Sequence, residues 1–179
     1  MDESNKLDGL EASTARLILR RLTAQDQPAM LRVFGDPAVM RYGDGVQTPE
    51  WIAGWLAQCA QQYRDRGYGP YAVIERRTHD VIGYCGLFDY PDIQGKPEVE
   101  VGYRLERAAW GRGFASEAAR AVRDQAFNRL GIAHLIAIID PANAASIRVA
   151  EKLGMHFEHT IMLPGYTYPD HVYGVYANR

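Results

Sequence analysis

The residues best suited to do chemistry form one short glycine-rich stretch, WGRGFASEA over residues 110–118, which leads into a helical pattern. Where side chains are missing, successive backbone N–H groups can point into one concavity and approach an anion closely. The helix N-terminus adds unpaired N–H donors and a partial positive charge. A phosphate or pyrophosphate site is therefore predicted, against the alternative of an ordinary glycine-rich loop. Its contacts would come from Gly111, Arg112, Gly113, Phe114, Ala115 and Ser116.

A dinucleotide-binding βαβ unit is a rival interpretation of the same glycines. That motif carries a third glycine where this chain has Ser116, and its first glycine directly follows the strand, whereas residues 106–110 intervene here. Its acidic residue falls roughly 20 residues further on, and Asp140 lies beyond that distance. These three differences disfavour a dinucleotide site.

A carboxylate lies on the strand that is predicted just before the glycine-rich stretch. Residues 98–105 alternate, so Glu98, Glu100, Gly102 and Arg104 share one face, and apolar or aromatic residues share the other. The polar face is expected to look into a substrate cleft. Partial burial there would raise the pKa of Glu100 and suit it to accept a proton. An ordinary solvated carboxylate on a strand is the alternative.

The hydrophobic pattern predicts the elements that position these residues, in the order β-α-α-β-β-β-α-β-α-β-β. Strands are expected near residues 17–22, 71–75, 81–88, 98–105, 134–139, 155–162 and 172–177, with a loop over 91–97. Helices are expected after the N-caps Thr23, Thr48 and Asn143, and near residues 115–130. This describes one mixed α/β domain over residues 14–179, preceded by a flexible tail over residues 1–13.

Composition argues against several other classes of protein. The chain has 179 residues, of which 47% are hydrophobic, and a formal net charge of -2, which does not suit binding to nucleic-acid phosphates. Cys59 and Cys85 are expected in the core rather than in a disulfide or as an acyl-accepting nucleophile. The five histidines show no metal-ligand spacing, so no metal is expected. No secretory signal or bilayer-spanning run is recognisable, which favours a cytoplasmic protein without a membrane partner.

Taken in order, the motifs resemble the GNAT acetyltransferases. The resemblance rests on Gly102-Tyr103, the 110–118 stretch, Asn143, Ser146 and EKLG over residues 151–154. TARLILR over residues 14–20 and DPAVM over residues 36–40 look like the branch that includes the ribosomal-protein N-terminal acetyltransferases. The wider superfamily usually has Gln or Arg where this chain has Trp110, but that branch carries an aromatic residue there.

The resemblance implies a single domain of the α+β type. Its sheet would be mixed and mostly antiparallel, with about seven strands splayed at the acyl-CoA slot and about four flanking helices. Acetyl-CoA would be the co-substrate. The backbone of Tyr103 and Leu105 would pair with the pantetheine arm and help polarise the thioester carbonyl, and Asn143 would bind the same arm. Ser146 would serve the departing thiolate, and Glu100 would be the base. Helix-local roles are the alternatives for Asn143 and Ser146.

The acceptor is expected to be a primary amine, on a protein N-terminus, a small amine or an amino acid, that attacks directly in a ternary complex. An aromatic wall with few acids does not suit a polycationic drug. A sensor that binds acyl-CoA without turnover, or a dinucleotide-dependent oxidoreductase, are the alternative functions. A homodimer is common among similar proteins. The expected wall consists of Tyr42, Trp51, Tyr68, Tyr166, Tyr168, Asp170 and His171.

Overall fold

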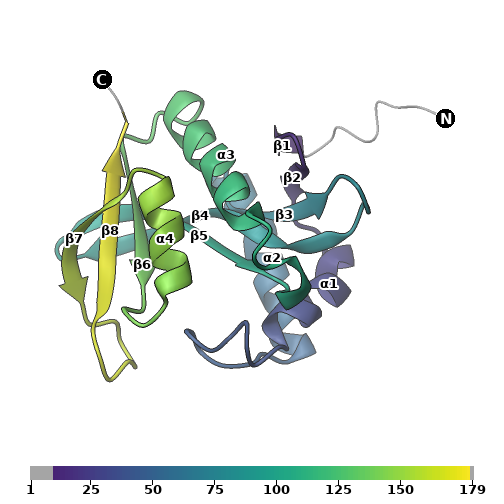
Figure 1. Ribbon diagram of the computed structural model, residues 1–179, viewed down its shortest axis with the longest axis horizontal. Helices are drawn as coiled ribbons and strands as arrows, with labels where there is room; N and C mark the ends of the chain where they lie inside the picture. Colours follow the sequence, from purple (N-terminus) through teal and green to yellow (C-terminus); the bar gives the residue numbers. More distant parts are fainter. Residues whose placement is uncertain (1–9, 178–179) are drawn as a thin grey trace.

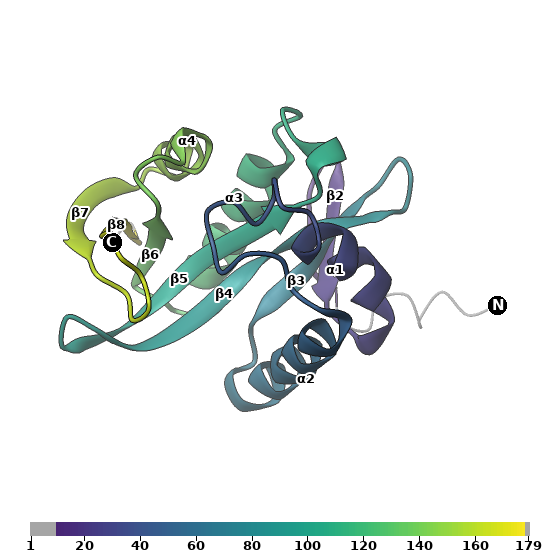
Figure 2. The same ribbon diagram turned by 90° about the horizontal axis from the view of Figure 1, so that it is seen from below.

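An eight-stranded sheet runs through the centre of the protein (Figure 1), in a computed structural model that describes residues 10–177. The strand order is β1-β2-β3-β4-β5-β6-β8-β7, and every neighbouring pair is antiparallel except β5 and β6, which are parallel. Helices α3 and α4 cover one face, and α1 and α2 cover the other (Figure 2). The predicted α+β class, with a mostly antiparallel sheet and four helices, is confirmed, and a doubly wound parallel sheet is ruled out.

The elements have the following bounds. The strands are β1 (Leu10–Ser13), β2 (Leu17–Arg21), β3 (Pro70–Glu75), β4 (Val81–Ile93), β5 (Lys96–Leu105), β6 (His134–Ile139), β7 (His156–Ile161) and β8 (Asp170–Tyr176). The α-helices are α1 (Gln27–Phe34), α2 (Pro49–Arg66), α3 (Phe114–Asn128) and α4 (Ala144–Lys152), and short 3-10 turns cover Ala24–Asp26 and Arg107–Ala109.

Strand β1 is a departure from the sequence prediction. Residues 10–13 were expected in a flexible tail, but they pair with β2 at the edge of the sheet, and residues 1–9 lie outside the described residues. Glu11, which makes this segment look solvated, accepts bonds from Arg21 at 2.7 Å and from Gln125 at 3.0 Å. The acidic residue therefore docks the strand, and the sheet has one strand more than expected.

The hairpin between β4 and β5 is longer than predicted. Most of the expected 91–97 loop is strand, since β4 continues to Ile93 and β5 begins at Lys96. The register shifts between Tyr90 and Ile93, and Pro91 sits in that irregularity. A bulge leaves a residue out of the ladder, so the missing N–H of proline costs nothing there.

Strands β5 and β6 are in register at one pair only, Glu100 opposite Ile136. At the closed end, His134 Nδ1 lies 2.8 Å from a carboxylate oxygen of Glu98, and Ile93 packs against Ile136. Beyond the single pair the two strands diverge. This is the predicted splay in the sheet, and it lies directly before the glycine-rich turn.

The predicted caps Thr48 and Asn143 begin α2 and α4, whereas the predicted cap Thr23 precedes the 3-10 turn Ala24–Asp26 and α1 begins after Asp26. The Thr48 hydroxyl accepts a bond from the Trp51 N–H at 3.2 Å, and Gly67 ends α2 with a φ of 76°. Cys59 and Cys85 are buried in the main core, as predicted, and burial raises the pKa of the Cys59 thiol to about 12. A thiol in this state is not a nucleophile at neutral pH. Among the helices described, none has the length and apolar character needed to cross a membrane.

Candidate active site

The turn before α3 has the backbone geometry of an anion site. Gly111 and Gly113 have φ values of 72° and 80°, a left-handed conformation that favours glycine, and Gly113 is the N-cap of α3. Among the described residues, no acceptor takes a hydrogen bond from the N–H groups of residues 111–116. A Cβ added to Gly111 would meet nothing within 4 Å, so the space above the turn is open.

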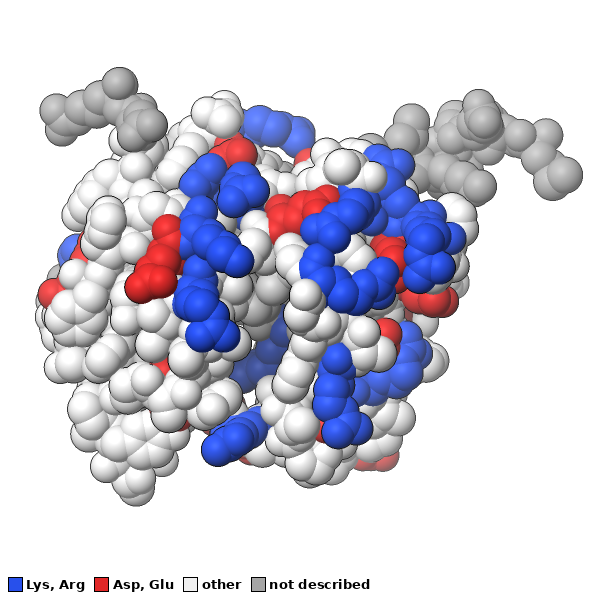
Figure 3. Space-filling view, in the orientation of Figure 1, with Lys and Arg blue, Asp and Glu red and all other residues white. Residues whose placement is uncertain are grey.

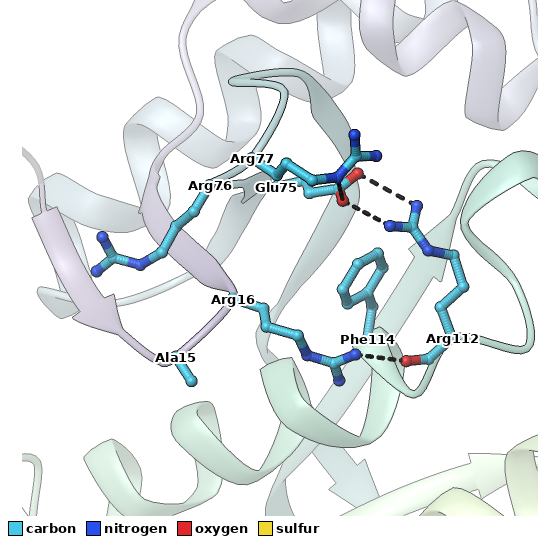
Figure 4. Close-up of a pocket in the computed structure, with 7 residues that line it drawn as sticks. All are labelled: Ala15, Arg16, Glu75, Arg76, Arg77, Arg112 and Phe114. Atoms are coloured by element: carbon cyan, nitrogen blue, oxygen red, sulfur yellow. Dashed lines mark hydrogen bonds and ion pairs between the residues drawn. The ribbon is translucent and has the colours of Figure 1, made fainter.

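Two arginines fix the orientation of this turn (Figure 4). Arg16 donates a 2.8 Å bond to the carbonyl of Arg112, and the Arg112 guanidinium pairs with Glu75 on β3, at 2.5 Å at its closest. Both guanidinium groups stack on the ring of Phe114, at 4.8 Å and 4.4 Å from its centroid. Because a peptide unit is planar, holding the Arg112 carbonyl also sets the direction of the Gly113 N–H. Arg112 therefore contributes its backbone to the anion-binding turn, because its side chain is bound to Glu75.

Glu117 anchors the same turn to the loop between β1 and β2. Its carboxylate accepts bonds from the Thr14 hydroxyl at 2.5 Å and from the Arg16 backbone and side chain at 3.0 Å and 2.7 Å. These bonds, against the opposing effect of burial, hold the pKa of Glu117 below its ordinary value. The sequence analysis missed this contact, since nothing in the chain signals that residues more than a hundred positions apart meet.

Positive charge surrounds the turn on two sides. Figure 3 shows two groups of Lys and Arg side chains separated by a hollow, one over α4 and the other beside the start of α3. Arg148 and Lys152 are exposed on α4. On the other side lies a pocket of about 360 Å³. Its lining residues are Ala15, Arg16, Glu75, Arg76, Arg77, Arg112 and Phe114 (Figure 4). Such a field favours phosphate groups at the turn.

Glu100 lies at the point where β5 and β6 diverge. Its carboxylate accepts a 3.0 Å bond from the backbone N–H of Ile138 on β6. Burial raises the pKa of Glu100, and the Ile138 N–H, Arg104 and Tyr90 oppose that rise without cancelling it. A carboxylate with a raised pKa is a better proton acceptor than a solvated one.

The predicted residues of the slot meet on the opposite face of β5. The Tyr103 hydroxyl donates a 3.2 Å bond to the Ser146 hydroxyl. The side-chain oxygen of Asn143 accepts from the Ser146 N–H at 3.2 Å and caps α4. The carbonyl of Leu105 already accepts a 2.9 Å bond from the indole of Trp110. The structure therefore brings Tyr103, Asn143 and Ser146 together.

Three of the five tyrosines and tryptophans expected around the acceptor lie in loops that touch one another. The phenols of Tyr42, Tyr166 and Tyr168 donate to the Ala142 carbonyl, Asp44 and Asp140, at 3.3 Å, 2.8 Å and 2.9 Å. These bonds join the loop between α1 and α2 to the loops after β6 and β7. Trp51 instead packs on α2, with ring centroids 5.2 Å from Phe34 and 6.4 Å from Trp55.

The remaining residues expected in the wall are spread around the same loops and the hairpin. The Tyr68 phenol donates a 2.6 Å bond to Asp89 on β4. Asp170 begins β8, and burial, with the nearby Asp140, raises its pKa. His171 follows it, with its ring 5.1 Å from Phe157. Asp44, Asp89, Asp140 and Asp170 thus lie near these aromatic residues, whereas the sequence analysis expected few acids there.

A row of aromatic residues beside Glu100 was missed from the sequence. Tyr84, Phe88 and Tyr90 on β4 are in register with Arg104, Glu100 and Glu98, so they share the face of β5 that carries Glu100. Alternation along residues 81–90 was visible in the sequence, but the register that aligns it with β5 was not. Within residues 10–177, no group of three or more His, Cys, Asp or Glu side chains is arranged to hold a metal ion.

Comparison with known proteins identifies relatives of this chain. Residues 16–156 match the model of the acetyltransferase (GNAT) domain. The uncharacterized protein YkkB of Bacillus subtilis (strain 168) is 41% identical over 155 residues, which cover 83% of this chain and 86% of that protein. The crystal structure of an acetyltransferase from Agrobacterium tumefaciens str. C58 aligns with a TM-score of 0.78 and 29% identity, over 92% of this chain and 93% of that one.

A more distant structure shares the fold. RimL, a ribosomal L7/L12 alpha-N-protein acetyltransferase solved with coenzyme A, aligns with a TM-score of 0.76 at 17% identity. The alignment covers 93% of this chain and 97% of that one. At this level of identity the likeness extends to the fold alone.

Proposed function

Because the chain belongs to the GNAT acetyltransferase family, we propose that it transfers the acetyl group of acetyl-CoA to a primary amine, by direct attack within a ternary complex. The acceptor amine belongs to a protein N-terminus, a small amine or an amino acid. The observation that carries the proposal is the left-handed turn at Gly111 and Gly113, whose N–H groups are open beside the splay in the sheet.

The residues present suit the phosphates of CoA. The N–H groups of residues 111–116 have no acceptor among the described residues, so they can donate to an anion. Open space above Gly111 lets an anion approach them, and basic side chains on both sides add attraction. The diverging edge of β5 near Tyr103 and Leu105, together with the Asn143 amide, would hold the pantetheine arm by strand addition.

The co-substrate supplies an acetyl group activated as a thioester. Glu100 supplies the base: its carboxylate accepts a proton from the acceptor ammonium, directly or through water, so that the free amine can form the new C–N bond as the C–S bond breaks. The Ile138 N–H holds the carboxylate at the edge of β6. The raised pKa of Glu100 supports this role, because it improves the driving force for proton acceptance.

The Tyr103–Ser146 pair provides the proton that the departing sulfur takes up. Ser146 would pass its hydroxyl proton to the sulfur and take the phenol proton of Tyr103, which donates to Ser146 Oγ, and solvent would then return a proton to Tyr103. The Ser146 N–H is bound by Asn143, which fixes the start of α4. Burial raises the pKa of Tyr103 to about 12, so the phenol stays protonated and keeps donating at neutral pH.

Ligand binding tests the proposal first. CoA and acetyl-CoA should raise the melting temperature, because they bind the folded state, whereas NAD and ATP should raise it far less. A screen of amines and peptides with acetyl-CoA, followed by free-thiol release, then tests turnover. Stabilisation by NAD but not by CoA would refute the proposal, and CoA binding without transfer to any amine would favour an acyl-CoA sensor.

A further inference from the structure

Arg104, on the Glu100 face of β5, is a cation that the described chain leaves without a contact anion. Its one hydrogen bond is to the Tyr84 phenol at 3.1 Å, and no carboxylate oxygen of residues 10–177 lies within 4 Å of it. Several other arginines also have no carboxylate that close, but all of them are exposed, whereas Arg104 is partly buried. Those exposed arginines are Arg41, Arg64, Arg76, Arg120, Arg129 and Arg148.

This arrangement is unusual for a guanidinium group withdrawn from water. The group carries five N–H donors, of which the described residues use one for a hydrogen bond. Charges inside proteins are normally paired, since an unpaired charge forfeits its hydration. Glu100 and Asp44 act on Arg104 through their charge but do not make contact. The unused donors of Arg104 therefore point to an anion that arrives with a ligand.

The surroundings of Arg104 give the ligand an orientation. Gly102 lies between Glu100 and Arg104 on the same face, and a Cβ there would come within 3.0 Å of the Phe88 ring and 3.8 Å of the Glu100 carboxyl carbon. The missing side chain lets the Phe88 ring lie directly against β5, between the Glu100 carboxylate and the Arg104 guanidinium on the same face. The loop between α1 and α2 crosses this part of β5 (Figure 2), and Gly43 contacts Arg104.

We infer that Arg104 binds a carboxylate of the acceptor, so that the acceptor is a small zwitterion with its amine at Glu100 and its carboxylate at Arg104. This inference rests on the proposed function and narrows its acceptor class to amino acids in the broad sense. A planar guanidinium forms two parallel bonds to a carboxylate, which gives both orientation and selectivity. Simple amines would offer Glu100 the same nitrogen but leave Arg104 without its anion.

The test compares matched acceptors. The test measures kcat/KM for two series of acceptors of increasing chain length. One series consists of straight-chain amino acids with the amine and carboxylate at opposite ends, and the other consists of the n-alkylamines of equal length. Acetyl-CoA is saturating and free thiol is followed. The best amino acid should exceed its alkylamine by about 10-fold to 100-fold in kcat/KM, the range expected for bonds to a charged partner. Arg104→Gln should remove this preference, mainly by raising KM for the amino acid at a pH on the plateau of the rate profile. Because Arg104 also lowers the pKa of Glu100, the acidic limb should move upward equally for both acceptor types. Arg104→Lys should restore part of the preference.

Each outcome separates the inference from the function on which it rests. Equal rates for amino acids and alkylamines in the wild-type enzyme would overturn the inference and leave acetyl transfer intact, and this comparison needs no variant to fold. An equal loss of kcat for both acceptor types on the plateau of the rate profile in Arg104→Gln, with the amino-acid preference kept, would also overturn it, because Arg104 would then act through Glu100. No transfer to any amine would overturn both. Arg107→Gln, an exposed arginine paired with Asp36 at 3.3 Å, is the matched control and should change nothing.

Discussion

Replacing Glu100 by Gln tests the assignment of the base most directly. Gln keeps the size of the side chain, and its carbonyl oxygen can still accept the 3.0 Å bond from the Ile138 N–H, so only proton acceptance is lost. General base catalysis is worth about 100-fold to 10,000-fold, so kcat should fall by at least roughly 100-fold, or about 2.7 kcal/mol in activation free energy. CoA affinity, measured by calorimetry, should stay the same, because the carboxylate does not contact the phosphate turn.

The pH profile sharpens this prediction. The wild-type rate should fall as pH drops through the pKa of Glu100, since a protonated carboxyl accepts no proton, and this acidic limb should lie above the ordinary value of 4.5. In Glu100→Gln the limb should vanish. A raised pKa in the folded state also means that ionised Glu100 destabilises the fold at pH values above it. The variant should therefore melt at the same or a higher temperature at neutral pH, while its activity is lost.

Glu98→Gln is the matched control, on the same strand and face. Although burial opposes it, bonds from Lys96 and His134 hold the pKa of Glu98 below its ordinary value. Its ionised form therefore stabilises the fold above its unfolded pKa, and that stability is lost as pH falls through the folded pKa. This variant should lower the melting temperature and leave the acidic limb in place. Near-normal turnover with an unchanged acidic limb in Glu100→Gln would show that Glu100 is only a structural carboxylate.

Three further substitutions test the rest of the site. Gly113→Val should weaken CoA binding by at least about 10-fold, because a β-branched side chain resists a φ of 80° and its Cβ would lie 3.4 Å from Arg16. Unchanged CoA affinity by calorimetry, with a normal circular dichroism spectrum, would show that this turn does not bind the phosphates. Ser146→Ala should lower kcat without moving the acidic limb, because Ser146 donates a proton to the leaving sulfur. Tyr103→Phe should lower kcat by a smaller factor. An unaltered kcat in Ser146→Ala would show that Ser146 takes no part in the mechanism.

Features that depend on a few consecutive residues were readable from the sequence. Local conformational preferences account for three such features. These are the left-handed turn at Gly111 and Gly113, the helix caps Thr48 and Asn143, and the alternation that places Glu100 on the polar face of its strand. The same patterns gave the order of seven of the eight strands and of all four helices.

Features that depend on which distant segments meet were not readable. The acidic character of residues 10–13 suggested a tail, because the chain alone does not show that Glu11 meets Arg21 and Gln125. The place of Tyr84 beside Arg104 depends on the register of β4 and β5, which the extended hairpin sets. Pro91 and Pro97 made this hairpin look like a loop in the sequence. Arg104 was visible on the right face of its strand, but its lack of a contact carboxylate is a property of the folded surroundings alone.

The single residue pair that joins β5 to β6 also governs how the protein fluctuates. Strands β6, β7 and β8 are held to the rest of the sheet through one short seam, closed at its end by Glu98, His134 and the Ile93–Ile136 contact. Such a short seam is expected to let the two parts of the sheet move relative to each other more easily than within themselves, within the limits set by the loop bonds of Tyr42 and Tyr166. A molecule lodged in the slot touches both parts, so its binding damps this motion. Amides on β8, far from any ligand atom, should then exchange with deuterium more slowly when CoA is bound.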